Sequence, residues 1–159
     1  MNNNQHLENY FNLIKKTSEN IDQEQISELI DNLLKIREND GRIFFLGVGG
    51  SAANASHAIN DFRKLCNIES YSPFDNISEL TARINDEGWE SALEEWLKVS
   101  NINNKDAIFI LSVGGGNLEK NVSVNLINAI KYAKSKSAKI FGIVGRDGGY
   151  TKVHGDCII

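Results

Sequence analysis

Two glycine-rich turns, each carrying a serine, are the residues whose types and spacing point most directly to chemistry. They are Gly47-Val48-Gly49-Gly50-Ser51 and Ser112-Val113-Gly114-Gly115-Gly116-Asn117, and each follows an apolar run of strand length. Where a strand passes through such a turn into a helix, the first N–H groups of the helix lack acceptors and the helix dipole favours an anion. We therefore expect the turns to form a split cradle for one phosphate group of a phosphorylated small molecule.

The first turn also fits a different kind of site, the dinucleotide fingerprint G-x-G-x-x-G/A. The matching residues are Gly47, Gly49 and Ala52, with Glu69 or Asp75 in the place of the ribose-binding carboxylate. Two observations count against it, because the hydroxyl of Ser51 suits a monophosphate and a second glycine-rich turn has no role in binding a pyrophosphate. A purely structural role stays open, since glycines permit tight turns between strands and helices.

The elements that must position these turns alternate between strands and helices. Apolar runs predict strands at 42–46, 107–111 and 140–144, a weaker strand at 70–74 and a buried strand at the end of the sequence. Helical periodicity is found at 51–65, 77–84, 89–97 and 122–133. Buried strands separated by helices predict a three-layer αβα sandwich with a parallel sheet, of the flavodoxin or Rossmann type. Ligands bind such sheets at the carboxyl ends of the strands, where both turns lie.

Residues 1–38 show a separate pattern, an amphipathic helical pair. Asp22 and Gln25 resemble a capping box before the second helix, and Asn39-Asp40-Gly41 breaks the pattern. The apolar residues at helical spacing are Leu7, Tyr10, Phe11, Ile14, Ile26, Leu29, Ile30, Leu33 and Leu34. Further along the chain, Trp89 and Trp96 stand seven residues apart, so we expect them on one helical face, in packing contacts.

Composition excludes several classes of function. The chain has 159 residues, which fits one domain with its own core. Its net charge of −4 and pI near 5.4 do not fit a protein that binds nucleic acid by neutralising phosphates. Cys66 and Cys157 stand far apart, which predicts reduced thiols and no zinc knot. No apolar run approaches the ~20 residues of a membrane span, so we expect a cytoplasmic protein.

Four motifs, in order, resemble those of one known family. Residues 47–61 are similar to the phosphate loop and active-site helix of sedoheptulose 7-phosphate isomerases, or phosphoheptose isomerases, of the SIS (sugar isomerase) domain superfamily. Residues 80–89 resemble its L-T-A-x-x-N-D-x-G segment, 112–117 its S-T-S-G-N-S phosphate loop and 145–149 its G-R-D-G-G turn. The resemblance implies a single SIS domain over 1–159, with a parallel α/β core at 42–159 and the helical pair at 1–38 serving homotetramer assembly.

The resemblance also implies roles for individual residues. Those expected to bind the sugar phosphate are Gly49, Gly50, Ser51, Asp61, Asn85, Asp86, Ser112, Val113, Gly114 and Asn117. Asp61 stands where the family has a catalytic glutamate that moves a proton between adjacent carbons through an enediol. His57 precedes it by four residues, so both side chains share one face of a helix, and both are candidate catalytic residues. The resemblance implies no required cofactor, but in some members this pair binds a metal, so His57 and Asp61 are a candidate zinc half-site. A structural pairing of the two side chains stays open.

This chain departs from the family pattern at several positions. Asp61 is one methylene shorter than glutamate, Val48 replaces an asparagine, and Gly114 and Asn117 replace two serines of the second loop. Extra glycine allows backbone N–H groups to take over from the lost side-chain donors. The family's C-terminal helix carries a glutamine and the second proton-transfer histidine. No counterpart occurs before Ile159, so we expect that the natural protein continues or that this chain is a shortened form.

These features predict two alternative functions. The first is an aldose–ketose isomerase resembling sedoheptulose 7-phosphate isomerase, with a phosphorylated sugar as substrate and a place in heptose synthesis for bacterial surface polysaccharide, such as lipopolysaccharide. The second is a non-catalytic SIS module that binds a phosphosugar or a protein partner as a regulator. Neither alternative calls for a nucleic-acid or membrane partner.

Overall fold

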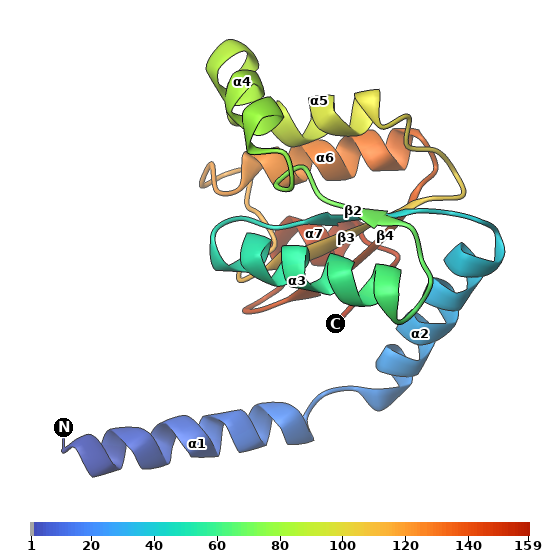
Figure 1. The fold of residues 1–159 in the computed structure, drawn as a ribbon. Helices are drawn as coiled ribbons and strands as arrows, with labels where there is room; N and C mark the ends of the chain where they lie inside the picture. Colours follow the sequence, from blue (N-terminus) through green and yellow to red (C-terminus); the bar gives the residue numbers. More distant parts are fainter. Residues whose placement is uncertain (1) are drawn as a thin grey trace.

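The computed structural model describes residues 2–159 and has the expected α/β fold (Figure 1). All pairs of neighbouring strands in its sheet are parallel, in the order β2-β1-β3-β4-β5. The strands are β1 (Ile43–Leu46), β2 (Ser70–Tyr71), β3 (Ala107–Ser112), β4 (Lys139–Val144) and β5 (Cys157–Ile158). This is the strand order of flavodoxin-like proteins, so the predicted fold class is confirmed.

Helices cover both faces of the sheet. They are α1 (Asn3–Glu19), α2 (Gln23–Glu38), α3 (Gly50–Lys64), α4 (Ile77–Glu87), α5 (Ala92–Val99), α6 (Val124–Ser135) and α7 (Gly149–His154). The helices α2 and α3 pack on one face, whereas α5 and α6 lie side by side on the other (Figure 1). The helix α4 projects outward from the second layer.

The central strands supply two hydrophobic clusters, because successive residues of a strand point to opposite faces of the sheet. Phe44 and Leu46 pack with apolar side chains of α5 and α6, and Ile43 and Phe45 pack with those of α2 and α3. All four side chains are at most 1% exposed. Burial on both faces explains why this strand is an uninterrupted apolar run in the sequence.

The position of the glycine turns follows from the strand order. The strands β1 and β3 are neighbours at the centre of the sheet, and their register pairs Leu46 with Ile110. From these two strands the chain winds outward in opposite directions, which makes the gap between them the topological switch point. Because both strands point the same way, the turns that follow them open at the same carboxyl edge of the sheet.

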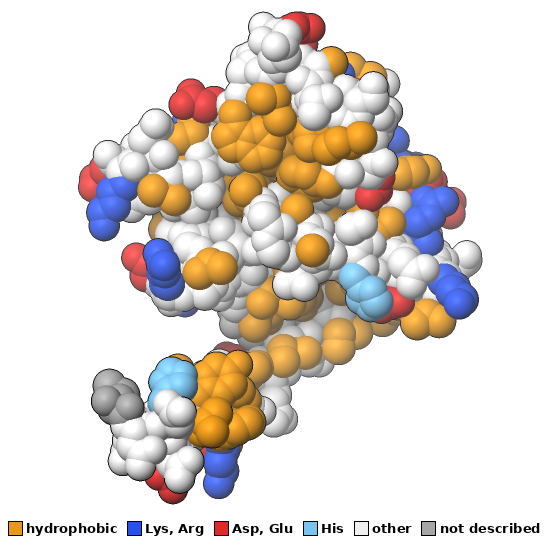
Figure 2. All heavy atoms as spheres, turned by 60° about the vertical axis from the view of Figure 1, so that its left-hand side comes forward, with side chains coloured by type: hydrophobic (Ala, Val, Ile, Leu, Met, Phe, Trp, Pro, Cys, Tyr) orange, Lys and Arg blue, Asp and Glu red, His pale blue; other side chains and the backbone are white. Residues whose placement is uncertain are grey.

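The N-terminal segment contains the two predicted helices. Asp22 caps α2, since its Oδ1 accepts hydrogen bonds from the N–H groups of Glu24 (2.9 Å) and Gln25 (3.1 Å). The helix α1 buries none of its residues and extends away from the sheet (Figure 1). Hydrophobic side chains gather on one side of it (Figure 2). They are Leu7, Tyr10, Phe11, Leu13 and Ile14, each between 47% and 64% exposed.

One local prediction is wrong. Trp89 and Trp96 do not share a helix, because α4 ends at Glu87, Gly88 adopts a φ of +88° and α5 begins only at Ala92. The helix α3 begins at Gly50 with Gly49 as its N-cap, so Ser51 lies in its first turn. Among residues 2–159 no helix combines the length and the apolar character needed to cross a membrane.

Candidate functional site

The first glycine turn forms an open helix N-terminus. A Cβ on Gly47 would lie 2.6 Å from the carbonyl carbon of Ser51, so the first turn of α3 packs directly on a residue that must be glycine. Gly49, the N-cap, has φ +61° and ψ −125°, a conformation that favours glycine. The N–H groups of Gly49 and Gly50 have no acceptor among residues 2–159. These free donors, together with the dipole of α3, make the turn suitable for an anion.

The second glycine turn is built differently. The Oγ of Ser112 accepts a hydrogen bond from the N–H of Gly115 at 3.0 Å. The carbonyl of Gly115 accepts from the N–H and the Oγ1 of Thr151, at 2.9 and 2.8 Å, and the carbonyl of Gly116 accepts from the N–H of Tyr150 at 2.8 Å. The turn is therefore held against the start of α7, which follows β4.

Asn117 belongs to a short backbone pairing that delays the next helix. Its backbone exchanges two hydrogen bonds of 2.9 Å with Val122, and its Oδ1 accepts from the N–H of Lys120 at 2.8 Å. The helix α6 begins only at Val124, so the expectation that the second turn leads straight into a helix is wrong. The dipole of a helix therefore acts on an anion at the first turn and not at the second.

His57 and Asp61 do lie together on one face of α3, as the sequence predicts. The Nε2 of His57 is 3.4 Å from an Oδ2 of Asp61, and the other carboxylate oxygen accepts from Asn60 at 3.1 Å. Both side chains are open to solvent, at 79% and 44% exposed. Asp61 is eleven residues after Gly50, which corresponds to about 16 Å along the helix axis. One helix therefore carries both the anion site and the candidate acid–base pair.

The same pair was the candidate zinc half-site. No group of three or more His, Cys, Asp or Glu side chains that could hold a metal ion occurs within residues 2–159. His57 and Asp61 alone supply two ligands, and protein zinc sites use three or four. The residues of one described chain therefore do not fit a zinc ion.

Asn85 and Asp86 lie on the last turn of α4, in solvent. The Nδ2 of Asn85 donates to an Oδ1 of Asp86 at 2.7 Å. No hydrogen bond within residues 2–159 links either side chain to a glycine turn. The helix α4 that carries them projects from the body of the molecule (Figure 1).

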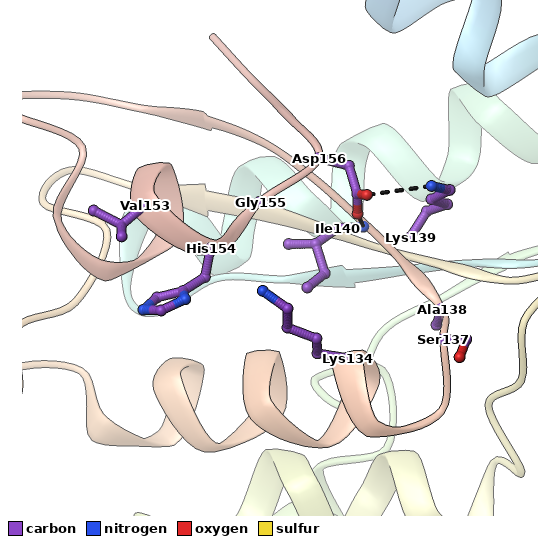
Figure 3. Close-up of a pocket in the computed structure, with 9 residues that line it drawn as sticks. All are labelled: Lys134, Ser137, Ala138, Lys139, Ile140, Val153, His154, Gly155 and Asp156. Carbon is purple, nitrogen blue, oxygen red and sulfur yellow. Dashed lines mark hydrogen bonds and ion pairs between the residues drawn. The ribbon is translucent and has the colours of Figure 1, made fainter.

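A pocket of about 350 Å³ lies at the opposite, amino edge of the sheet (Figure 3). Lys134, His154 and Asp156 line it, and Nζ of Lys139 pairs with Asp156 at 3.2 Å. The helices α6 and α7 both end here, and cationic side chains near helix C-termini balance the exposed carbonyls. The pocket contains no residue of either glycine turn, and no motif in the sequence pointed to it.

Arg146 lies near the second turn, and the sequence patterns described above predict no role for it. A Cβ on Gly114 would lie 3.9 Å from Nη1 of Arg146, so the guanidinium group lies over that turn. The position of Arg146 as the second residue of the Gly145-Arg146-Asp147-Gly148-Gly149 motif is the feature of the sequence that could have indicated a role for it.

Comparisons with known proteins place the chain among sugar isomerase domains. A phosphoheptose isomerase from Helicobacter pylori (strain P12) is 31% identical over 144 residues, which cover 87% of this chain and 71% of that protein. The lincomycin biosynthesis protein LmbN of Streptomyces lincolnensis is 32% identical over 119 residues, 69% of this chain and 42% of LmbN.

Solved structures agree with these sequence relatives. A phosphoheptose isomerase from Neisseria gonorrhoeae superposes with a TM-score of 0.84 at 25% identity, covering 98% of this chain and 83% of that one. One from Francisella tularensis, at 17% identity, shares the fold with a TM-score of 0.82 over 96% of this chain and 78% of that chain. The SIS domain family model matches residues 5–145. The chain therefore belongs to the SIS domain family.

Proposed function

We propose that this protein is a sugar-phosphate isomerase that interconverts sedoheptulose 7-phosphate and the corresponding aldose phosphate. The observation that carries the proposal is the arrangement of α3, where free N–H donors at Gly49 and Gly50 start a helix that also bears His57 and Asp61. The similarity to phosphoheptose isomerases supports this substrate class.

In the proposed reaction, Asp61 acts as the base. Its carboxylate takes a proton from C1 of the ketose, next to the C2 carbonyl, and an enediol forms as the C2 oxygen gains a proton. Return of a proton to C2, with loss of the C1 hydroxyl proton, yields the aldose. His57, at 3.4 Å from Asp61, orients the carboxylate. Proton exchange at the two oxygens calls for a second acid–base group besides Asp61.

The phosphate end of the substrate would bind at the first turn. The N–H groups of Gly49 and Gly50 and the half-buried Ser51, whose hydroxyl has no partner among residues 2–159, would donate to phosphate oxygens. The sugar would then extend along α3 toward Asp61, whose side chain tilts back toward the N-terminus of the helix. Ser112, Val113, Gly114 and Asn117 of the second turn would line the same ligand, and Asn85 and Asp86 would reach sugar hydroxyls only if α4 moves or a neighbouring copy presents them.

We further propose that the protein works as a homotetramer. The solvent-exposed positions of His57 and Asp61 leave the reacting carbons uncovered in one chain, and enediol chemistry benefits from exclusion of water. The apolar side of α1 is unpartnered within the chain and would contact other copies. A neighbouring copy would cover the site and supply the second acid–base group.

Turnover without a metal, a cytoplasmic location and a role in heptose synthesis for surface polysaccharide such as lipopolysaccharide are consistent with the substrate class. The net charge of −4 supports the expectation of no nucleic-acid partner.

The test follows sedoheptulose 7-phosphate by NMR in the presence of the purified protein. We expect signals of the aldose phosphate to appear, and Asp61→Asn to lower kcat at least about 10²-fold. Asp31→Asn is the matched control, since Asp31 is exposed on α2 and should leave the rate unchanged. Absence of product, or an undiminished rate for Asp61→Asn, would refute the proposed reaction.

One observation favours the second candidate, a phosphosugar-binding regulator. Asp61 is exposed and one methylene shorter than the family's glutamate, and a displacement on the ångström scale can cost about 10²-fold in rate. Tight binding of the sugar phosphate without any turnover would select this alternative.

A further inference from the structure

We infer that Arg146 is a binding residue for the phosphate monoester group of the ligand, contributing a positive charge from the loop after β4. This inference rests on the proposed function in its choice of ligand, and it adds a third loop to the two glycine turns. The observations that carry it are the position of the guanidinium group, its lack of a protein partner and the way the surrounding backbone is held.

The guanidinium group lies over the second glycine turn. A Cβ on Gly114 would be 3.9 Å from Nη1 and 4.0 Å from Cδ of Arg146. The strands β1, β3 and β4 are consecutive neighbours, so the loops after β1 and β4 are separated by two strand spacings, about 10 Å. Since Gly114 follows the middle strand β3, a guanidinium group over Gly114 lies between its own loop and the first turn, where the phosphate is proposed to bind.

Arg146 is the arginine that lacks an acceptor within residues 2–159. The other four arginines of the chain each donate to a protein oxygen. Arg37 donates to the carbonyl of Cys66 and Arg63 to that of Ser70. Arg42 donates to the carboxylate of Asp106 and Arg83 to that of Glu79. The neighbouring carboxylate, Asp147, does not pair with Arg146 and instead accepts from the N–H of Gly149 at 3.2 Å.

The backbone under Arg146 is fixed although the side chain is exposed. Gly145 donates to the carbonyl of Ser112 at 3.1 Å, and Gly148 donates to the carbonyl of Gly145 at 3.0 Å. Arg146 itself has a φ of +55°, which is uncommon for a residue with a side chain. The turn thus holds an arginine in a left-handed conformation and directs it over Gly114.

The chemistry of the second turn explains what such a cation would add. Gly114, Gly115 and Gly116 have no side-chain donors, and the N–H of Gly115 is already used by Ser112. A phosphate monoester carries close to two negative charges at neutral pH. A guanidinium group binds two phosphate oxygens at once, in a geometry that a lysine does not reproduce. Arg146 would therefore supply charge and orientation that the glycines cannot.

The test compares Arg146→Gln and Arg146→Lys with the wild-type protein. Arg37→Gln is the matched control, because it removes the same charge from the helix that leads into β1, at the amino edge of the sheet. Calorimetry measures binding of sedoheptulose 7-phosphate, inorganic phosphate and unphosphorylated sedoheptulose. We expect Arg146→Gln to weaken both phosphate-containing ligands by about tenfold or more, Arg146→Lys to weaken them less, and neither to change the weak binding of sedoheptulose.

Turnover separates this inference from the proposed function. In an active wild-type protein, KM should rise in Arg146→Gln while kcat stays within about threefold. If the wild type binds the phosphate ligands without turnover and Arg146→Gln weakens them, the isomerase proposal fails and the inference stands. Any one of four results would overturn the inference. They are unchanged phosphate affinity in Arg146→Gln, an equal loss of affinity in Arg37→Gln, a loss only for the sugar phosphate, and no phosphate binding by the wild type.

Discussion

The Nε2 atom of His57 lies 3.4 Å from Oδ2 of Asp61, one helical turn later on α3. This contact links the two side chains that the sequence singled out for proton transfer, and it occurs on the exposed side of a helix whose N-terminus is free to bind an anion. We expect His57→Ala to lower kcat about tenfold with little change in KM, because the carboxylate would lose the group that orients it. Steady-state kinetics measure kcat and KM, and Asn54→Ala is the control because Asn54 is an exposed residue one turn earlier on α3. Equal kcat values would remove His57 from the mechanism.

The close packing of α3 on Gly47 predicts a strong effect of a single methyl group. Gly47→Ala places a Cβ 2.6 Å from the Ser51 backbone, so we expect the free energy of unfolding to fall by about 1–3 kcal/mol. A Cβ on Gly50 would meet nothing within 4 Å, so Gly50→Ala should leave the free energy of unfolding unchanged or raise it by less than about 1 kcal/mol. Urea denaturation of both variants measures the difference. Similar midpoints would show that the backbone of the turn shifts to accommodate the added methyl group.

The buried thiol of Cys157 predicts a loss of stability at high pH. Burial raises the pKa of this thiol above its ordinary value of 9.0, and the nearby charges of Glu28 and Asp156 raise it further. The unfolded chain loses this proton near pH 9 and the folded chain only at higher pH. The stabilising contribution is therefore complete below about pH 9 and disappears as the pH rises through the raised folded value.

Unfolding free energies between pH 8 and pH 10.5 test this prediction. We expect the unfolding free energy of Cys157→Ala to fall less steeply with pH than that of the wild type, whatever the stability of the variant at pH 8. Cys66→Ala is the control, since Cys66 is only partly buried. Parallel curves for wild type and Cys157→Ala would exclude the thiol as the cause.

The two-ligand geometry at His57 and Asp61 predicts that activity does not depend on zinc. Dialysis against a chelator should leave kcat within error of the untreated protein, and metal analysis of the active protein should find less than one zinc per chain. A loss of activity that added zinc restores would contradict this and would mean that groups from outside the described chain complete the site.

The uncovered apolar side of α1 predicts assembly through this helix. Phe11 is 64% exposed, and Phe11→Asp should shift the mass found by analytical ultracentrifugation from tetramer to smaller species. Asn12→Asp introduces the same charge at the neighbouring position and should leave the mass unchanged. A monomeric wild-type protein would argue against the proposed tetramer.

Much of the fold was predictable because its signals are local. The run Arg42-Ile43-Phe44-Phe45-Leu46 is apolar because β1 is buried on both faces, and Asp22 marks the start of α2 because its carboxylate caps the helix. The i,i+4 spacing of His57 and Asp61 likewise guaranteed a shared helical face, which the structure contains.

The sequence by itself determined the fold class, the helix that carries the anion site and the pairing of His57 with Asp61, since each depends on periodicity within one segment. Only the tertiary structure decided how the second turn is used. Its carbonyls accept hydrogen bonds from Thr151 and Tyr150, in a segment more than thirty residues away, and the guanidinium group of Arg146 lies over Gly114. Hydrogen bonds between distant segments leave no periodic signal, so the sequence could not show that the second turn packs on α7 or that Arg146 lies over it.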